Sequence, residues 1–116
     1  MGVDFSHGDA HFGYGGFDYF RTNLAKAIGI DLPAMQGHGG SQSWEGISDP
    51  LVLFLRPFDV EIKIPPDLCP AVADRLLEVT TTFTPPEGWK NADVVALEVI
   101  EGLREAAIKG ELFKSF

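Results

Sequence analysis

The N-terminal segment holds a group of side chains whose types could bind a metal ion. His7, Asp9 and His11 alternate along the chain, and Asp4 precedes them. In a β-strand alternate residues share one face, so two imidazoles and a carboxylate would converge there on a zinc or iron ion. Gly8 and Asp9 are residues that turns prefer, so a solvated turn is the alternative. The metal interpretation would make the protein a small metal-dependent enzyme.

Ser6, His7 and Asp9 also have the composition of a nucleophile, a base and an orienting acid. Catalytic triads draw these members from separate elements, and no Gly-x-Ser-x-Gly nucleophile elbow occurs in this sequence. We therefore expect no serine-hydrolase site here.

A second group combines aromatic rings with a guanidinium. Its members are Phe12, Tyr14, Phe17, Tyr19, Phe20 and Arg21. Aromatic rings and arginine are enriched at interface hot spots, whereas rings gathered on one helix face usually form a core. Because two opposite faces of one helix cannot both be core, some of these side chains should be exposed. The candidate binding residues are Tyr14, Phe17, Tyr19, Arg21, His7 and His11, and core packing of the rings is the alternative.

A helix should follow the first sixteen residues and begin at Phe17. Phe17, Phe20, Leu24 and Ile28 recur at helical spacing, and Gly29 follows where a helix commonly ends in a left-handed residue. We expect a short strand before this helix at residues 3–5.

The middle of the chain is harder to assign. Residues 48–50, Ser-Asp-Pro, are typical of a helix start. The apolar run 51–55 then fits a buried helix of two turns or a buried strand, and periodicity leaves both open. Residues 58–64 alternate between apolar and polar, which predicts an extended segment with one buried face.

Two helices are expected in the last third. The first opens at Pro65 and would bury Leu68, Val72, Leu76 and Val79. Residues 80–89 form a linker with two prolines. Residues 91–109 form the longest helix, which Gly110 ends and whose inward face would carry Ala96, Val99 or Ile100, Leu103 and Ala107. Residues 112–116 form a tail that could pair with the N-terminal strand. The predicted fold is a mainly α, single-domain helical bundle (residues 1–116) with a short β pairing from the N-terminal strand, residues 58–64 or the tail.

Composition restricts the partners and the compartment. The formal net charge is −8, which disfavours nucleic acid because binding to phosphates needs several Lys or Arg side chains. The single cysteine, Cys69, fits a reducing compartment, and no apolar run is long enough to span a membrane. We expect the cytoplasm of a cell or of an infected host.

Three stretches of the chain carry a resemblance. They are residues 7–24, from the His-Gly-Asp-Ala-His-Phe opening to Leu24; residues 49–55, beginning Asp-Pro-Leu-Val; and residues 64–76, beginning Ile-Pro-Pro-Asp and including Cys69. In these stretches the chain resembles small proteins encoded by actinobacterial genomes and their phages. The resemblance brings no activity with it, but it implies a helix-loop-helix segment similar to an EF-hand.

In that group the segment before Ile64 resembles a calcium loop, in which oxygens at alternating positions and a glycine hold the ion. In this register, the sequence keeps Asp59 and Glu61 as ligand positions. Ile62 replaces the glycine, and Leu68 occupies the twelfth position, where a carboxylate is needed. A β-branched residue disfavours the positive φ required there, so we expect a degenerate loop that binds no calcium.

The sequence as a whole favours a non-enzymatic, acidic binding module. Its partner would be a protein or a small ligand, and no cofactor is expected. A phage accessory or counter-defence protein that acts on a host protein is one form of this function. The alternative is the metal-dependent enzyme based on His7, Asp9 and His11. The sequence leaves the oligomeric state open.

Overall fold

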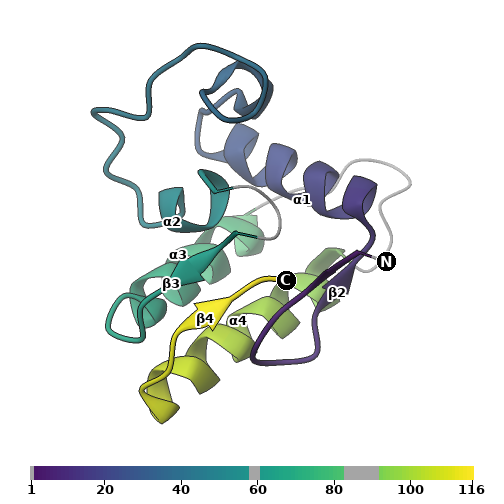
Figure 1. The fold of residues 1–116 in the computed structure, drawn as a ribbon, viewed down its shortest axis with the longest axis vertical. Coiled ribbons are helices and arrows are strands. Elements are labelled where there is room, and N and C mark those ends of the chain that lie inside the picture. The colour runs from purple at the N-terminus through teal and green to yellow at the C-terminus, as the bar shows by residue number, and fades with distance from the viewer. Residues whose placement is uncertain (1, 58–60, 83–91) are drawn as a thin grey trace.

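The computed structural model describes residues 2–57, 61–82 and 92–116, and Figure 1 shows the order of its elements. The helices are α1 (Tyr14–Ala27), α2 (Val52–Leu55), α3 (Cys69–Thr82) and α4 (Ala92–Lys109), with a 3₁₀ turn η1 (Leu32–Ala34). The strands are β1 (Val3–Asp4), β2 (His11–Phe12), β3 (Lys63–Ile64) and β4 (Phe113–Lys114). The fold is mainly helical with short β pairing, as predicted. The bundle arrangement and the single domain stay predictions.

The short strands form two antiparallel pairs. β1 pairs with β2, and β3 pairs with β4. The chain beyond β4 continues beside the N-terminus, where Asp4 and Phe116 exchange two backbone hydrogen bonds of 2.9 Å and Phe5 bridges Ser115. The predicted pairing of the tail with the N-terminal strand is therefore confirmed. β3 lies within the predicted extended segment, of which residues 58–60 lie outside the described residues.

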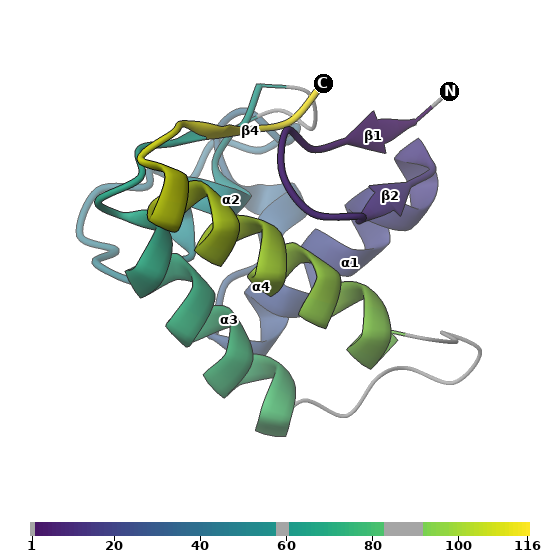
Figure 2. The ribbon, with the colours of Figure 1, turned by 90° about the horizontal axis from the view of Figure 1, so that it is seen from below.

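Helices α3 and α4 lie side by side and form an outer layer (Figure 2). Their inward faces bury Val72 and Leu76 on one helix and Ile100 and Leu103 on the other. This follows the predicted periodicity of both helices, because residues three and four apart share a helix face.

Phenylalanine rings from four segments meet at the centre of the molecule. Phe5 stacks on Phe113 with ring centroids 5.3 Å apart, and Phe12 lies 4.9 Å from Phe17. Phe54 of α2 meets Phe17 edge-on at 5.7 Å. The N-terminal strands, α1, α2 and the tail thus share one aromatic cluster. Core packing is confirmed for these N-terminal rings.

Some boundaries differ from the predicted ones. α1 begins at Tyr14 rather than at Phe17, because the carbonyl of Gly13 accepts the Phe17 N–H and starts the helical ladder. Gly29, with φ of 84°, ends the helix as expected. α2 contains one turn instead of two, and it is helical rather than extended.

α3 also departs from its prediction at both ends. It begins at Cys69 after a turn, so Leu68 is 41% exposed rather than inward, and Cys69 takes the buried position. The helix continues to Thr82, where a linker was predicted, and the Thr80 hydroxyl donates to the carbonyl of Leu76. The rest of the predicted linker, residues 83–89, lies outside the described residues.

The loop between β1 and β2 rests directly on α4 through two glycines. A β-carbon added to Gly8 would lie 2.9 Å from the Cα of Gly102, and one added to Gly102 would lie 2.4 Å from the carbonyl oxygen of His7. Gly8 also has a φ of 79°, which other residues adopt only with strain. Both positions therefore require glycine for the loop to sit on the helix.

Replacing Gly102 by alanine tests this contact. Alanine in a helix interior is normally about 1 kcal/mol more favourable than glycine. Here the new methyl group must displace backbone, so we expect Gly102→Ala to lower the free energy of unfolding by about 1–3 kcal/mol. Urea denaturation followed by circular dichroism measures the change. Gly16→Ala is the matched control, because nothing lies within 4 Å of its β-carbon. An equal effect of both substitutions would contradict the contact.

Candidate functional site

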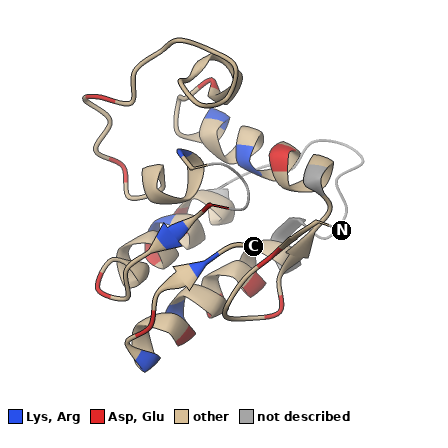
Figure 3. Ribbon diagram, viewed as in Figure 1, with Lys and Arg blue, Asp and Glu red and all other residues tan. Residues whose placement is uncertain are grey.

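The β1–β2 loop, the end of α4 and the tail surround an open cleft of about 800 Å³. Four carboxylates line it, from Asp9, Glu101, Glu105 and Glu111, together with the ammonium groups of Lys109 and Lys114. Acidic positions lie both on the loop and along α4 (Figure 3). Four negative groups against two positive ones give the cleft a net negative charge when His7 is neutral. The cleft therefore favours a cationic ligand.

Glu105, which lines the cleft, is held in its charged form. Its side chain accepts a hydrogen bond from Lys109 Nζ at 3.1 Å and another from the Gly8 N–H at 3.2 Å. The bond to Lys109 is the main reason why the pKa of Glu105 is lowered, and the same bond raises the pKa of Lys109. The Gly8–Gly102 contact brings the loop close enough for the second bond.

His7 joins the loop to the tail. Its Nδ1 lies 2.7 Å from Ser6 Oγ, and its Nε2 lies 3.0 Å from a carboxylate oxygen of Glu111. One assignment satisfies every group: the Ser6 hydroxyl donates to Nδ1, the Nε2–H donates to Glu111, and Ser6 Oγ accepts the Lys114 N–H at 3.0 Å. The imidazole also stacks on Phe113. We call this group, Ser6, His7, Glu111 and Lys114, the His7 clip.

The His7 clip contains a serine, a histidine and an acid, but its bonds indicate a structural role. Ser6 Oγ is tied to the backbone of the tail, and the nearby Gly8 N–H, which could otherwise stabilise an oxyanion, already binds Glu105. The acid that contacts His7 is Glu111, a residue missed by the sequence analysis. The predicted pairing of the tail with the N-terminal strand could have indicated Glu111, since this pairing places residues 111–114 beside residues 6 and 7.

The structure does not bring the predicted metal ligands together. His11 Nδ1 pairs with Asp4 at 2.7 Å on the hairpin, whereas His7 binds Glu111 and Asp9 is exposed at the cleft. The strand covers only residues 11 and 12 here, so the alternation does not extend back to His7. In the described ranges 2–57, 61–82 and 92–116, no group of three His, Cys, Asp or Glu side chains could hold a metal ion.

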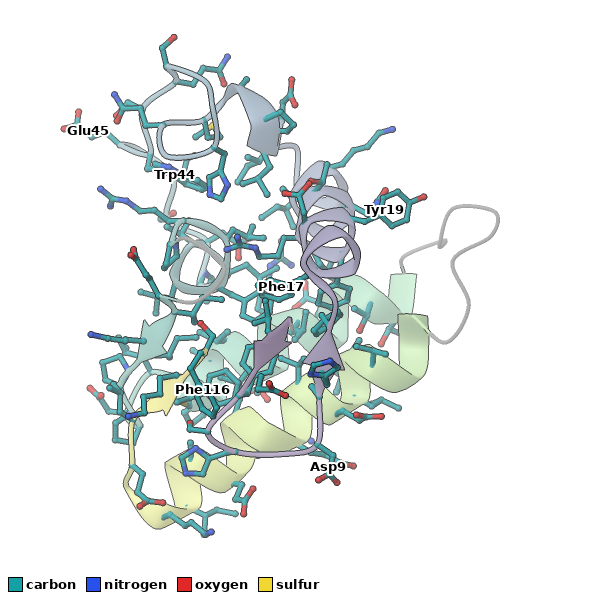
Figure 4. All side chains as sticks on the ribbon, turned by 45° about the vertical axis from the view of Figure 1, so that its right-hand side comes forward. Asp9, Phe17, Tyr19, Trp44, Glu45 and Phe116 are labelled. Atoms are coloured by element: carbon teal, nitrogen blue, oxygen red, sulfur yellow. The ribbon has the colours of Figure 1, made fainter. Side chains whose placement is uncertain are left out.

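The predicted aromatic binding surface is wrong for two of its members. Phe17 is completely buried and Arg21 is 3% exposed, because both lie on the face of α1 that packs against α2. Figure 4 shows Phe17 pointing into the molecule and Tyr19 pointing away from it. Tyr19, which is 43% exposed, can contact a partner. The side chain of Tyr14 lies outside the described residues.

Arg21 binds the end of α2. Its guanidinium donates to the carbonyls of Phe54 and Leu55 at 3.3 and 3.4 Å and to the carbonyl of Pro57, and it lies 4.7 Å above the Phe17 ring. The last carbonyls of a helix lack partners within it and carry negative partial charge, so a buried cation is well placed there.

The structure describes most residues of the degenerate calcium loop. Asp59 lies outside the described residues, and Glu61 is exposed. Ile62, at the position of the expected glycine, is buried and exchanges hydrogen bonds with Ser115: its N–H donates to the serine hydroxyl, and its carbonyl accepts the serine N–H, both at 3.0 Å. Ile62 therefore joins this segment to the tail through hydrogen bonds of its backbone rather than forming the turn of an ion-binding loop.

Comparison with protein-family models, with curated proteins and with solved structures finds no significant match to this chain. None of the described helices has the length and apolar character needed to cross a membrane.

The position of Arg21 leads to a stability prediction. Arg21→Ala should lower the free energy of unfolding by more than about 2 kcal/mol, because charge-assisted hydrogen bonds to buried carbonyls are lost. Tyr19→Ala, on the exposed face of the same helix, should cost much less. Thermal and urea denaturation of both variants measures the difference. A stable Arg21→Ala protein would show that the guanidinium contributes little to the fold.

The separation of the histidines and the buried Ile62 lead to a metal prediction. Neither Ca²⁺ nor Zn²⁺ at millimolar concentration should raise the melting temperature, since a metal that binds the native state stabilises it by mass action. Differential scanning fluorimetry with and without chelator checks this. A saturable rise of several degrees with either ion would overturn the prediction for that ion.

Proposed function

We propose that this protein is a non-catalytic binding module whose acidic cleft holds a basic segment of a partner protein. The observation that carries the proposal is the charge of the cleft, four carboxylates against two ammonium groups on three converging segments. A small cationic ligand is the other occupant that this chemistry would accept.

Two features make these carboxylates suited to a cation. Glu105 and Glu111 are already oriented, the first by Gly8 and Lys109 and the second by His7, so little side-chain entropy is lost on binding. The net charge of −8 would also steer a positive partner toward the protein and speed encounter at low salt. The exposed Glu101 extends the negative surface along α4.

The contacts of the His7 clip support binding over catalysis. Ser6 and His7 use their polar atoms to join the loop to the tail, as described above. The alternative of a metal-dependent enzyme has no converging ligand set among the described residues, and we do not propose it. The resemblance to phage-encoded proteins extends the proposal: the partner would then be a host protein, met in the host cytoplasm.

A labelled lysine octamer is a suitable probe for the cleft. We expect it to bind the wild type at low salt and to dissociate as salt rises, because exposed charges are screened. Asp9→Asn with Glu111→Gln should weaken binding in fluorescence anisotropy titrations. The matched control, Asp31→Asn with Glu45→Gln, changes the net charge equally outside the cleft, and Figure 4 shows Glu45 at the opposite end of the molecule from Asp9. Equal affinities of the two double variants would refute the cleft as the binding site.

A further inference from the structure

The outward face of α4 carries a pattern that the cleft does not explain. Four side chains share this face: Leu97, Glu101, Arg104 and Ile108. At 100° per residue they fall within a sector of about 60°, so they form one straight row. Leu97 is 48% exposed and Ile108 is 86% exposed, the highest value among the large apolar side chains described. We call these four residues the α4 row.

Single exposed apolar side chains are common and need no explanation. The informative property of the α4 row is its symmetry. Leu97 and Ile108 lie at equal distances from the midpoint between residues 102 and 103, and so do Glu101 and Arg104. A two-fold axis through this midpoint would place Leu97 against Ile108 of a second copy and Glu101 against its Arg104. Each contact would then occur twice, as in an isologous interface.

The order of charges selects one orientation. In an antiparallel pair of α4 helices, both central contacts join a carboxylate to a guanidinium. In a parallel pair, Glu101 would face Glu101 and Arg104 would face Arg104, which is repulsive. Within its own chain Arg104 pairs with Asp74 of α3 at 3.6 Å, and both partners are largely exposed. Such surface pairs contribute little, so the guanidinium can exchange this contact for Glu101 of a second copy.

We propose that two copies of this chain associate through their α4 rows, antiparallel, in a weak dimer. The arrangement of the molecule permits this, because α4 lies in the outer layer beside α3 with the other helices behind it (Figure 2). The row extends for about 16 Å along the helix, so the buried area falls at the low end of specific interfaces. The dimer therefore forms only at high protein concentration.

The dependence on salt concentration distinguishes this dimer from the binding of a cation in the cleft, on which the proposed function depends. Each copy carries a net charge of −8, so two copies repel one another over long distances. Screening should therefore strengthen the dimer at moderate salt, whereas it weakens the binding of a cation in the cleft. Glu101 belongs to both surfaces and is left unchanged in the test of the cleft. Either proposal can thus fail without the other.

Sedimentation velocity over a range of protein concentrations tests the dimer. The wild type should shift from 12.6 kDa toward twice this mass. Ile108→Glu should weaken association by at least about tenfold, since it puts an acid into the apolar ends of the contact. Tyr19→Ser, at a similarly exposed ring on α1, should leave association unchanged. A wild type that stays monomeric at millimolar concentration would overturn the proposal, as would an unaffected Ile108→Glu variant.

A charge exchange then tests the orientation. Glu101→Arg alone places Arg against Arg in both central contacts, and Arg104→Glu alone places Glu against Glu, so each variant should be monomeric. Mixed in equal amounts, the two variants restore opposite charges at both contacts and should form a heterodimer, which native mass spectrometry identifies by mass. Circular dichroism confirms that both variants are folded. No heterodimer, or undiminished homodimers of either variant, would exclude the antiparallel pairing.

Discussion

Where Gly8 meets Gly102, two backbones approach more closely than a β-carbon at either position would permit, and the cleft is built outward from this point. The loop rests on α4, so the Gly8 N–H reaches Glu105 and His7 reaches Glu111. A bulkier residue at either position would lift the loop from the helix. The electrostatics of the cleft therefore depend on a steric condition, the absence of two side chains, as well as on the charges themselves.

A different kind of interaction holds the other side of the molecule. Arg21 reaches through the core to the carbonyls at the end of α2, and its planar guanidinium serves several acceptors while lying on the ring of Phe17. A one-turn helix such as α2 has little stability of its own, because nucleation is costly and few hydrogen bonds repay it. The cation offsets this by binding the carbonyls that the helix leaves open, so α1 and α2 are stabilised as a pair.

Helical spacing predicted α1, α3 and α4, because each buries a regular stripe of apolar residues, and Gly29 and Gly110 marked two of the ends. The same spacing could not reveal the role of Arg21, whose type suggests a surface and whose acceptors lie more than 30 residues away. Glu111 was missed for a related reason, since its partner is 104 residues distant. Gly102 offered a local signal: a glycine inside a helix pattern costs about 1 kcal/mol relative to alanine, so its presence there points to a packing reason.

During synthesis, residues 6 and 7 leave the ribosome more than a hundred residues before Glu111 and Lys114, to which they bind. At roughly 5–20 residues per second the delay is about 5–20 s, whereas a hairpin forms within microseconds. The β1–β2 hairpin and α1 can therefore form first, with Phe5, Phe12 and Phe17 in contact while Phe113 is still missing. In such a nascent chain the apolar rings stay exposed to chaperones until the tail has been synthesised. The cleft is thus the last part of the molecule to form, and only chains that have completed the fold possess it.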